Sequence, residues 1–242
     1  RDTHQPDKSA PAKRKKRKSS KLVMFALALF VVILLVFAAG AVGYYILAID
    51  LPGIAALKDY RPSIASCVYD DNNELIDEFF LEDRKIIKID EVPKIVHHAF
   101  IAAEDSRFYQ HQGFDMQSIS RALFKNFEAG HIVQGASTIT QQVAKMMYLS
   151  PEKKYMRKVR EAILAYKIDK YLTKDEILNL YLNQIYLGHG TYGIESASLG
   201  YFGKSAKSLT LPEAAMLAGL PKAPSTYSPF LHYDKAKQRQ IY

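Results

Sequence analysis

The chain has 242 residues, of which 48% are hydrophobic and 24% are charged, so a wholly disordered chain is excluded. Its formal net charge of +8 would be typical of a nucleic-acid-binding protein if it were evenly spread. Residues 1–21, however, carry nine Lys and Arg against Asp2 and Asp7. The basic character therefore belongs to a tail, for which we favour a topology signal over nucleic-acid binding, and no nucleic-acid partner is expected.

An uncharged segment follows the tail. Residues 22–49 contain no charged side chain and would form a helix of roughly 42 Å at ~1.5 Å per residue. This exceeds the ~30 Å hydrocarbon core of a bilayer, so a transmembrane helix is predicted. A cleaved signal peptide is the alternative, but its apolar region would be only ~7–15 residues long. The positive-inside rule then predicts that the tail is cytoplasmic and that the chain after residue 50 lies outside.

Residues 50–90 are predicted to form a connection and a small β region. The turn signal DNN at 71–73 separates two short apolar runs, and RKIIKI at 84–89 alternates in part. A hairpin or three-stranded ribbon is expected in 64–89, which reads as the only strand-like region. Cys67 is the single cysteine, so no internal disulfide can form, and the scattered histidines offer no metal site of the Cys/His type.

Helical patterns dominate residues 91–242. Two capping boxes mark helix starts, Thr173 with Glu176 and Thr210 with Glu213. The other predicted helices cover 94–104, 115–128 with its end at Gly130, 138–148, 154–172 and 191–200. Many helices joined by short links predict a mainly α fold with one compact helical domain over 91–242.

Three stretches carry candidate site residues, and the first is GASTITQQVAKMMYLS at 135–150. If Ser137 caps a helix, then Thr138, Gln142 and Lys145 recur at i, i+4 and i+7 and share one face. The alternative is an ordinary amphipathic helix with a hydrated polar face. The spacing alone favours this ordinary helix, although polar helix faces usually carry more Glu and Lys than Thr and Gln.

The second stretch, RKVREAILAYKIDKYL at 157–172, places Arg157 and Lys158 within one turn of Glu161. A surface ion pair worth roughly 0.3–0.5 kcal/mol is one interpretation. A cationic cradle for a diphosphate, with a carboxylate embedded in it, is the other.

The third stretch, AAEDSRFYQHQGFD at 102–115, follows an apolar run. Glu104 is predicted to be partly desolvated, and Asp105 beside it adds like charge, so both effects raise the pKa of the Glu104 carboxyl. If the helix continues, Glu104, Phe108 and His111 share a face. The alternative is a helix end with solvated acids and with Phe108 in the core.

Five ordered motifs resemble those of the peptidoglycan glycosyltransferases, which are the monofunctional transglycosylases and the amino-terminal halves of class A penicillin-binding proteins. The motifs are EDSRFYQHQG at 104–113, GASTITQQ at 135–142, RKVRE at 157–161, KDEILNLYLNQIYLG at 174–188 and KAPSTYSP at 222–229. The resemblance implies a lysozyme-like helical domain, preceded by the small β region and the transmembrane helix.

The resemblance also implies an activity, namely inverting transfer of a glycan from a lipid-diphosphate donor to the sugar 4-hydroxyl of lipid II. Glu104 would be the general base and Glu161 the second essential acid. Lys158, with Arg157 and Lys145, would neutralise the leaving diphosphate.

The remaining implied site residues lie in the first two motifs. Thr138 and Gln142 would line the cleft, whereas Asp105, Phe108 and His111 would shape the site or contact substrate. A divalent cation, commonly Mg²⁺, assists many members of the family, and no ligands for it can be assigned in this sequence.

The implied partners are lipid II, the lipid-linked nascent glycan, membrane lipids and other cell-wall synthesis proteins. The implied location is the bacterial cytoplasmic membrane, with a single pass and the catalytic domain on its outer face. Four apolar residues could dip into the bilayer or belong to the core: Ile119, Leu123, Phe124 and Phe127.

The sequence departs from the family pattern at Lys222, where Arg is common and would offer a planar fork. It contains no ordered set of transpeptidase motifs, so the chain as given is not expected to bind β-lactams covalently. The segment DKAKQRQIY at 234–242 resembles the link toward a transpeptidase domain, so a fragment of a bifunctional protein is expected. The alternatives to a transferase are a lysozyme-like peptidoglycan hydrolase and a non-catalytic cell-wall synthesis scaffold.

Overall fold

The computed structural model describes residues 17–49, 57, 62, 66–148 and 154–241. The basic tail up to residue 16 and nearly all of the predicted connection lie outside these described residues. The chain divides into two compact units, Arg1–Asp50 and Leu51–Tyr242.

The first unit contains helix α1, Arg17–Ile49. Within it, the 24 residues Leu22–Tyr45 have a mean hydropathy of 3.2, and none of the side chains in this span is buried. At ~1.5 Å per residue this span matches the hydrocarbon core of a bilayer. Among the described residues, α1 is the one helix that is long and apolar enough to cross a membrane.

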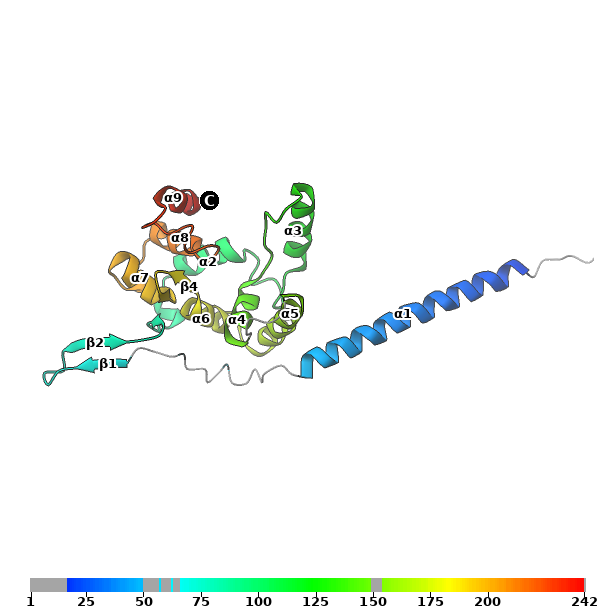
Figure 1. Cartoon of the computed structure of the whole chain (residues 1–242), viewed down its shortest axis with the longest axis horizontal. Helices are drawn as coiled ribbons and strands as arrows, with labels where there is room; N and C mark the ends of the chain where they lie inside the picture. Colours follow the sequence, from blue (N-terminus) through cyan, green and yellow to red (C-terminus); the bar gives the residue numbers. More distant parts are fainter. Residues whose placement is uncertain (1–16, 50–56, 58–61, 63–65, 149–153, 242) are drawn as a thin grey trace, which may run out of the picture. The chain divides into compact units, whose positions relative to one another are not determined.

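The second unit is mainly helical, as predicted (Figure 1). Its α-helices are α2 (Lys94–Glu104), α3 (Met116–Ala129), α4 (Ile139–Tyr148), α5 (Lys154–Tyr171), α6 (Lys174–Gln184), α7 (Ile194–Phe202), α8 (Leu211–Gly219) and α9 (Tyr233–Ile241). A short 3₁₀ helix, η2 (Ile89–Glu91), precedes α2, and another, η3 (Ala206–Ser208), lies between α7 and α8. Both predicted capping boxes are confirmed at the starts of α6 and α8.

Helix α3 shows how local sequence sets its ends. Asp115 is the N-cap, and its carboxylate accepts the backbone N–H groups of Gln117 and Ser118 at 3.0 and 3.1 Å. Gly130 ends the helix in the left-handed conformation, with φ of 69°, which a residue without a Cβ adopts at little cost. The predicted termination of this helix at Gly130 is therefore confirmed.

The core of the domain joins helices that are distant in sequence. Helix α2 packs against α8, α8 packs against α9, and α4 packs against both α5 and α6. Phe100 of α2 meets Tyr181 of α6 edge to face, with ring centroids 6.2 Å apart. The largest fully buried side chains are Tyr181, Phe100, Phe108, Ile139, Leu164, Ile168, Ile177, Leu178, Leu182, Leu187, Ile194 and Leu217. This packing holds the C-terminal end of α2 beside α4 and α8.

Strands form two small sheets. The antiparallel pair β1 (Ser66–Tyr69) and β2 (Leu75–Phe79) confirms the predicted hairpin. Strand β3 (Asp83–Arg84) does not extend it, because it pairs in parallel with β5 (Thr191–Tyr192), which in turn pairs with β4 (Tyr186–Gly188). The prediction that 64–89 is the only strand-like region is therefore wrong.

Side chains explain why the alternating segment after β3 is not a strand. The buried Asn183 amide accepts the Ile87 N–H at 3.0 Å and donates to the Ile87 carbonyl at 2.9 Å. Ser196 Oγ accepts the Lys85 N–H at 2.7 Å. Because these backbone groups are satisfied by α6 and α7, they need no neighbouring strand. The helix predicted from residue 191 begins three residues later, at Ile194, since Thr191 and Tyr192 form β5.

Candidate active site

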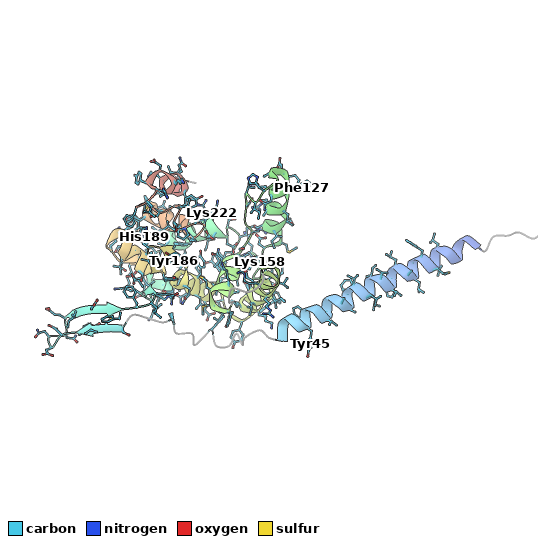
Figure 2. All side chains as sticks on the ribbon, viewed as in Figure 1. Tyr45, Phe127, Lys158, Tyr186, His189 and Lys222 are labelled. Carbon is cyan, nitrogen blue, oxygen red and sulfur yellow. The ribbon has the colours of Figure 1, made fainter. Side chains whose placement is uncertain are left out.

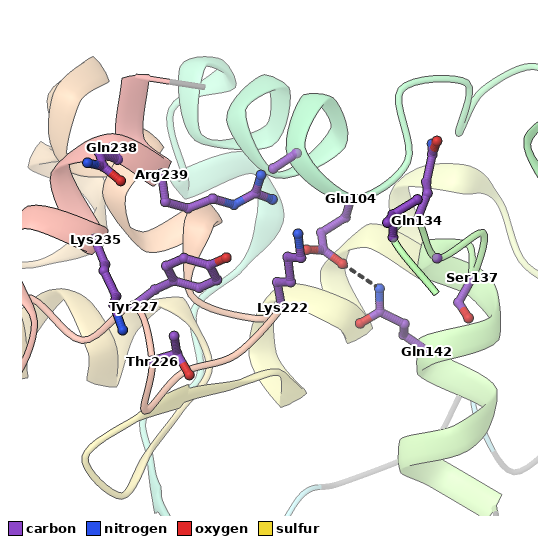
Figure 3. A pocket seen from close by; sticks show the side chains of 13 residues that line it. Glu104, Gln134, Ser137, Gln142, Lys222, Thr226, Tyr227, Lys235, Gln238 and Arg239 are labelled. Atoms are coloured by element: carbon purple, nitrogen blue, oxygen red, sulfur yellow. Dashed lines mark hydrogen bonds between the residues drawn. The ribbon is translucent and has the colours of Figure 1, made fainter. Parts of the chain in front are cut away.

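A cavity of about 950 Å³ lies between the end of α2, the segment before α4, and the segment around α9. Figure 3 shows it from close by. Its charged lining residues are one carboxylate and three cations, Glu104, Lys222, Lys235 and Arg239, and Gln142 and Ser137 are among its uncharged polar ones. A carboxylate facing fixed positive charge within a concave site is the arrangement expected of an acid–base centre that handles an anionic substrate.

Glu104 is the last residue of α2. The helix stops there because Asp105 leaves the helical region, with φ of −158° and ψ of 70°, while its N–H closes the last turn on the Ile101 carbonyl at 2.9 Å. Gln142 Nε2, on α4, donates to Glu104 Oε2 at 2.7 Å. This bond fixes the carboxylate at the cavity wall and leaves its other oxygen to face the cavity (Figure 3).

Burial raises the pKa of the Glu104 carboxyl, and the charge of Asp105 acts in the same direction. The hydrogen bond from Gln142 and the charges of Arg239 and Lys222 oppose this rise without cancelling it. The predicted desolvation of Glu104 is thus present, and a raised pKa suits a carboxylate that takes a proton near neutral pH.

Asp105 points away from the cavity and into the fold. It is 7% exposed, and its carboxylate pairs with His111 Nε2 at 2.9 Å and accepts the Ile139 N–H at 3.0 Å. Phe108 is fully buried, as the core interpretation of that residue proposed. The helix does not continue past Glu104, so the predicted shared face of Glu104, Phe108 and His111 does not exist.

The start of α4 differs from the prediction in one residue. Thr138, and not Ser137, is the capping residue, because Thr138 Oγ1 accepts the Gln141 N–H at 3.1 Å while Gln141 Oε1 accepts the Thr138 N–H at 3.0 Å. Thr138 is 2% exposed and donates to the Gly113 carbonyl at 2.5 Å. Thr138 is therefore buried behind residues that line the cavity and does not line this cavity itself.

Gly113 brings the first motif against α5. Its φ is +82°, and a Cβ at this position would lie 2.4 Å from the Ala165 carbonyl oxygen. Only glycine allows this close approach of two backbone segments. The contact aligns the residues after α2 with α5 and with the start of α4.

The predicted diphosphate cradle is only partly assembled around the cavity. Lys158 bonds to Glu161, which is 3% exposed, and also donates to Ser137 Oγ at 2.9 Å. Since Ser137 lines the cavity, this pair lies one hydrogen bond behind its wall. Lys145 is exposed on α4 and Arg157 is half-buried on α5, and neither lines the cavity.

The cations that line the cavity all come from residues 222–239, of which the sequence analysis singled out only the first part. The fifth motif drew attention to Lys222, but Lys235 and Arg239 on α9 were not predicted as site residues. Their signal in the sequence is weak, because DKAKQR resembles an ordinary exposed helix. The segment forms helix α9, which packs on α8. Its expected role as a link toward a transpeptidase domain stays a prediction.

The predicted divalent cation would need ligands from the chain or from the substrate. The part of the chain that the structure describes contains no group of three or more His, Cys, Asp or Glu side chains that could hold a metal ion. Mg²⁺ often uses one or two carboxylates together with substrate phosphates. No ligand set is assigned, and no chemical step is derived through a cation.

The helical unit matches a known protein family. The family model described as Transglycosylase matches residues 72–242, so the helical unit with its acid and amide at a cationic cavity is a transglycosylase domain. The chain belongs to the transglycosylase family, which confirms the resemblance inferred from the five motifs.

Its relatives are much longer. Penicillin-binding protein 1A of Neisseria flavescens is 51% identical over 192 residues, covering 79% of this chain and 24% of the relative. Penicillin-binding protein 1F of Bacillus subtilis (strain 168) is 48% identical over 176 residues, covering 73% and 25%. A crystal structure of penicillin-binding protein 1A from Haemophilus influenzae covers 75% of this chain and 17% of its own, with a TM-score of 0.38 and 25% sequence identity. The chain thus spans about a quarter of the length of these curated relatives.

Proposed function

We propose that this chain is the glycosyltransferase part of a longer class A penicillin-binding protein and that it polymerises lipid II into glycan strands. The observation that carries the proposal is the Glu104–Gln142 pair at the wall of a cationic cavity, in a chain of the transglycosylase family. The acceptor is the 4-hydroxyl of lipid II, and the donor is the lipid-linked nascent glycan.

In the proposed reaction Glu104 takes the proton of the acceptor hydroxyl. The oxygen forms a bond to the donor anomeric carbon, the bond from that carbon to the diphosphate breaks, and the configuration inverts. Because the leaving group is already a stable anion, fixed positive charge serves it better than a strong general acid. We assign this role to Lys158 with Arg157 and Lys145, and Glu161 holds Lys158 in place.

The membrane is part of the proposal. Helix α1 would anchor the chain in the cytoplasmic membrane with the tail inside, so that enzyme and lipid-linked substrates share one surface. On α3, Leu123, Phe124 and Phe127 are 66%, 70% and 88% exposed, and Figure 2 shows Phe127 on that helix. Such a row of exposed apolar side chains favours contact with lipid over a place in the core.

A divalent cation that assists the leaving diphosphate remains a prediction, as does recruitment of other cell-wall synthesis proteins. Titration with EDTA followed by Mg²⁺ would test the cation. Loss and recovery of polymerisation would support it, and full activity in EDTA would contradict it.

The decisive assay supplies purified lipid II to the full chain in detergent. We expect glycan polymer from the wild type and a loss of about 10²-fold or more for Glu104→Gln, since a general base contributes 10²–10⁴-fold. Release of sugars from preformed peptidoglycan without polymer would favour the hydrolase instead. Unchanged polymerisation by Glu104→Gln would show that Glu104 is not the base.

A further inference from the structure

Helix α9 brings a second charged group to the proposed base. Figure 3 shows the Arg239 side chain running from α9 toward Glu104, with Lys222 beside it. Glu104 and Arg239 are distant in sequence, but the helices that carry them, α2 and α9, both pack against α8. The relative position of Glu104 and Arg239 is therefore set by one helix.

Two contacts fix the path of the Arg239 side chain, and a third holds its helix in place. At Gly219 on α8 a Cβ would lie 2.9 Å from Arg239 Cγ, so the missing side chain leaves the space through which the arginine stem passes. The guanidinium carbon lies 6.0 Å from the centroid of the Tyr227 ring, within the range of a cation–π contact. Gln240 Nε2 donates to the Pro212 carbonyl at 2.6 Å and holds α9 to the start of α8.

Glu104 is faced by charged or titratable groups from several elements. Arg239 lies on α9, Lys222 follows α8, Asp105 is its own neighbour, and Tyr181 lies on α6. Burial and the nearby carboxylates raise the pKa of Tyr181 well above its ordinary value, so that phenol stays neutral. Arg239 and Lys222 are thus the groups that favour the ionised form of Glu104, and Arg239 is the one held by the fold at its stem and at its head.

We propose that Arg239 is a positioning residue whose guanidinium, held between Gly219 and Tyr227, keeps the buried Glu104 carboxylate ionised and ready to accept a proton. This inference rests on the proposed function for its role in the reaction. The arrangement itself concerns only the ionisation of Glu104, which can be measured without substrate.

The test compares Arg239→Met with Lys237→Met, a matched loss of charge on the same helix at a residue that does not line the cavity. For Arg239→Met we expect polymerisation of lipid II to fall about threefold or more at pH 6 and to return to within about twofold of wild type at pH 8.5, because loss of an opposite charge makes Glu104 harder to ionise. Lys237→Met should follow the wild-type profile, and Arg239→Lys should restore most of the activity at pH 6.

A second measurement separates this inference from the proposed function. Protein labelled with ¹³C at the glutamate side-chain carboxyl is titrated, and the Glu104 signal is assigned by its loss in Glu104→Gln. Its midpoint should move to higher pH in Arg239→Met, and also in Gly219→Ala, which displaces the arginine stem and keeps the charge. If wild-type chain makes no polymer but the midpoint moves, the proposed function fails and the Arg239 inference stands. An unmoved midpoint, or an equal loss of activity at every pH in folded Arg239→Met, would overturn the inference.

Discussion

At the scale of single residues, the burial of Glu104 destabilises the ionised form of its carboxyl. Burial raises the pKa of this carboxyl, so the folded state binds its proton more tightly than the unfolded state does. Glu104 therefore adds to the free energy of unfolding at low pH. This contribution is lost as the pH rises from the pKa of the carboxyl in the unfolded state through its higher pKa in the folded state. A base that is ready to take a proton thus makes the fold less stable.

We predict that Glu104→Gln, whatever its activity, unfolds at the same or a higher temperature than wild type at pH 8. Gln carries no charge to desolvate, and it can still accept the bond from Gln142. At pH 4, where the wild-type carboxyl is also protonated, the gain should disappear. Thermal melts followed by circular dichroism at the two pH values test this, and a clear loss of stability at pH 8 would contradict it.

Sequence reasoning assigned Glu104 and Gln142 to one site because both belong to motifs with a family resemblance, and a hydrogen bond joins the two side chains. It placed Thr138 at the surface, since i, i+4 spacing describes a helix face but not what covers that face. The burial of Thr138 depends on Gly113, which approaches from outside the helix. Such contacts are set by tertiary packing and leave no mark in the local pattern.

At the scale of elements, α4 depends on an acceptor outside its own sequence. The Asp105 carboxylate accepts the Ile139 N–H at the first turn of α4 and pairs with His111. We predict that Asp105→Ala lowers the free energy of unfolding by about 2–3 kcal/mol, because buried groups that bond to a charge lose their partner. Urea titration measures this.

The control is Asp71→Ala in the exposed hairpin turn, which should change stability by no more than about 0.5 kcal/mol. A similar small effect of Asp105→Ala would mean that α4 does not need this carboxylate. Asp105→Asn keeps an acceptor oxygen and should fall between the two.

The close approach of Gly113 to the backbone of α5 can be tested by comparison with Gly130, which has a similar φ. Gly113→Ala combines a positive φ with a backbone clash at Ala165, and should cost about 3 kcal/mol or more. Gly130→Ala has a similar φ of +69° but nothing within 4 Å, so it should cost only about 1 kcal/mol. Equal losses in urea titrations would show that backbone strain, and not the close approach, dominates at Gly113.

Elements with local signals were predicted well, and those with non-local partners were not. The capping boxes and Gly130 act within one helix turn, so the sequence displays them directly. Strand β5 pairs with β3 from across the chain and with β4 on its other side, and two- or three-residue strands have no recognisable alternation. The role of α9 at the cavity likewise depends on packing against α8.

At the scale of the whole molecule, orientation in the membrane can be measured with the protein's single cysteine. Cys67 is exposed on β1, after the apolar helix. If the proposed orientation holds, a membrane-impermeant maleimide should label Cys67 in intact cells stripped of their outer layers. Ser9→Cys in a Cys67→Ser background should react only after the membrane is opened, and the reverse pattern would contradict the orientation.

The residues that line the cavity are far apart in sequence, so the ribosome adds them at different times. Glu104 and Gln142 are synthesised first, whereas Lys222, Lys235 and Arg239 follow about 80 or more residues after Gln142. A nascent chain that ends before α9 therefore has the carboxylate without the cations of that helix. Under the proposed function, polymerisation would begin only when α9 has docked on α8, so translation order itself would delay activity until the domain is complete.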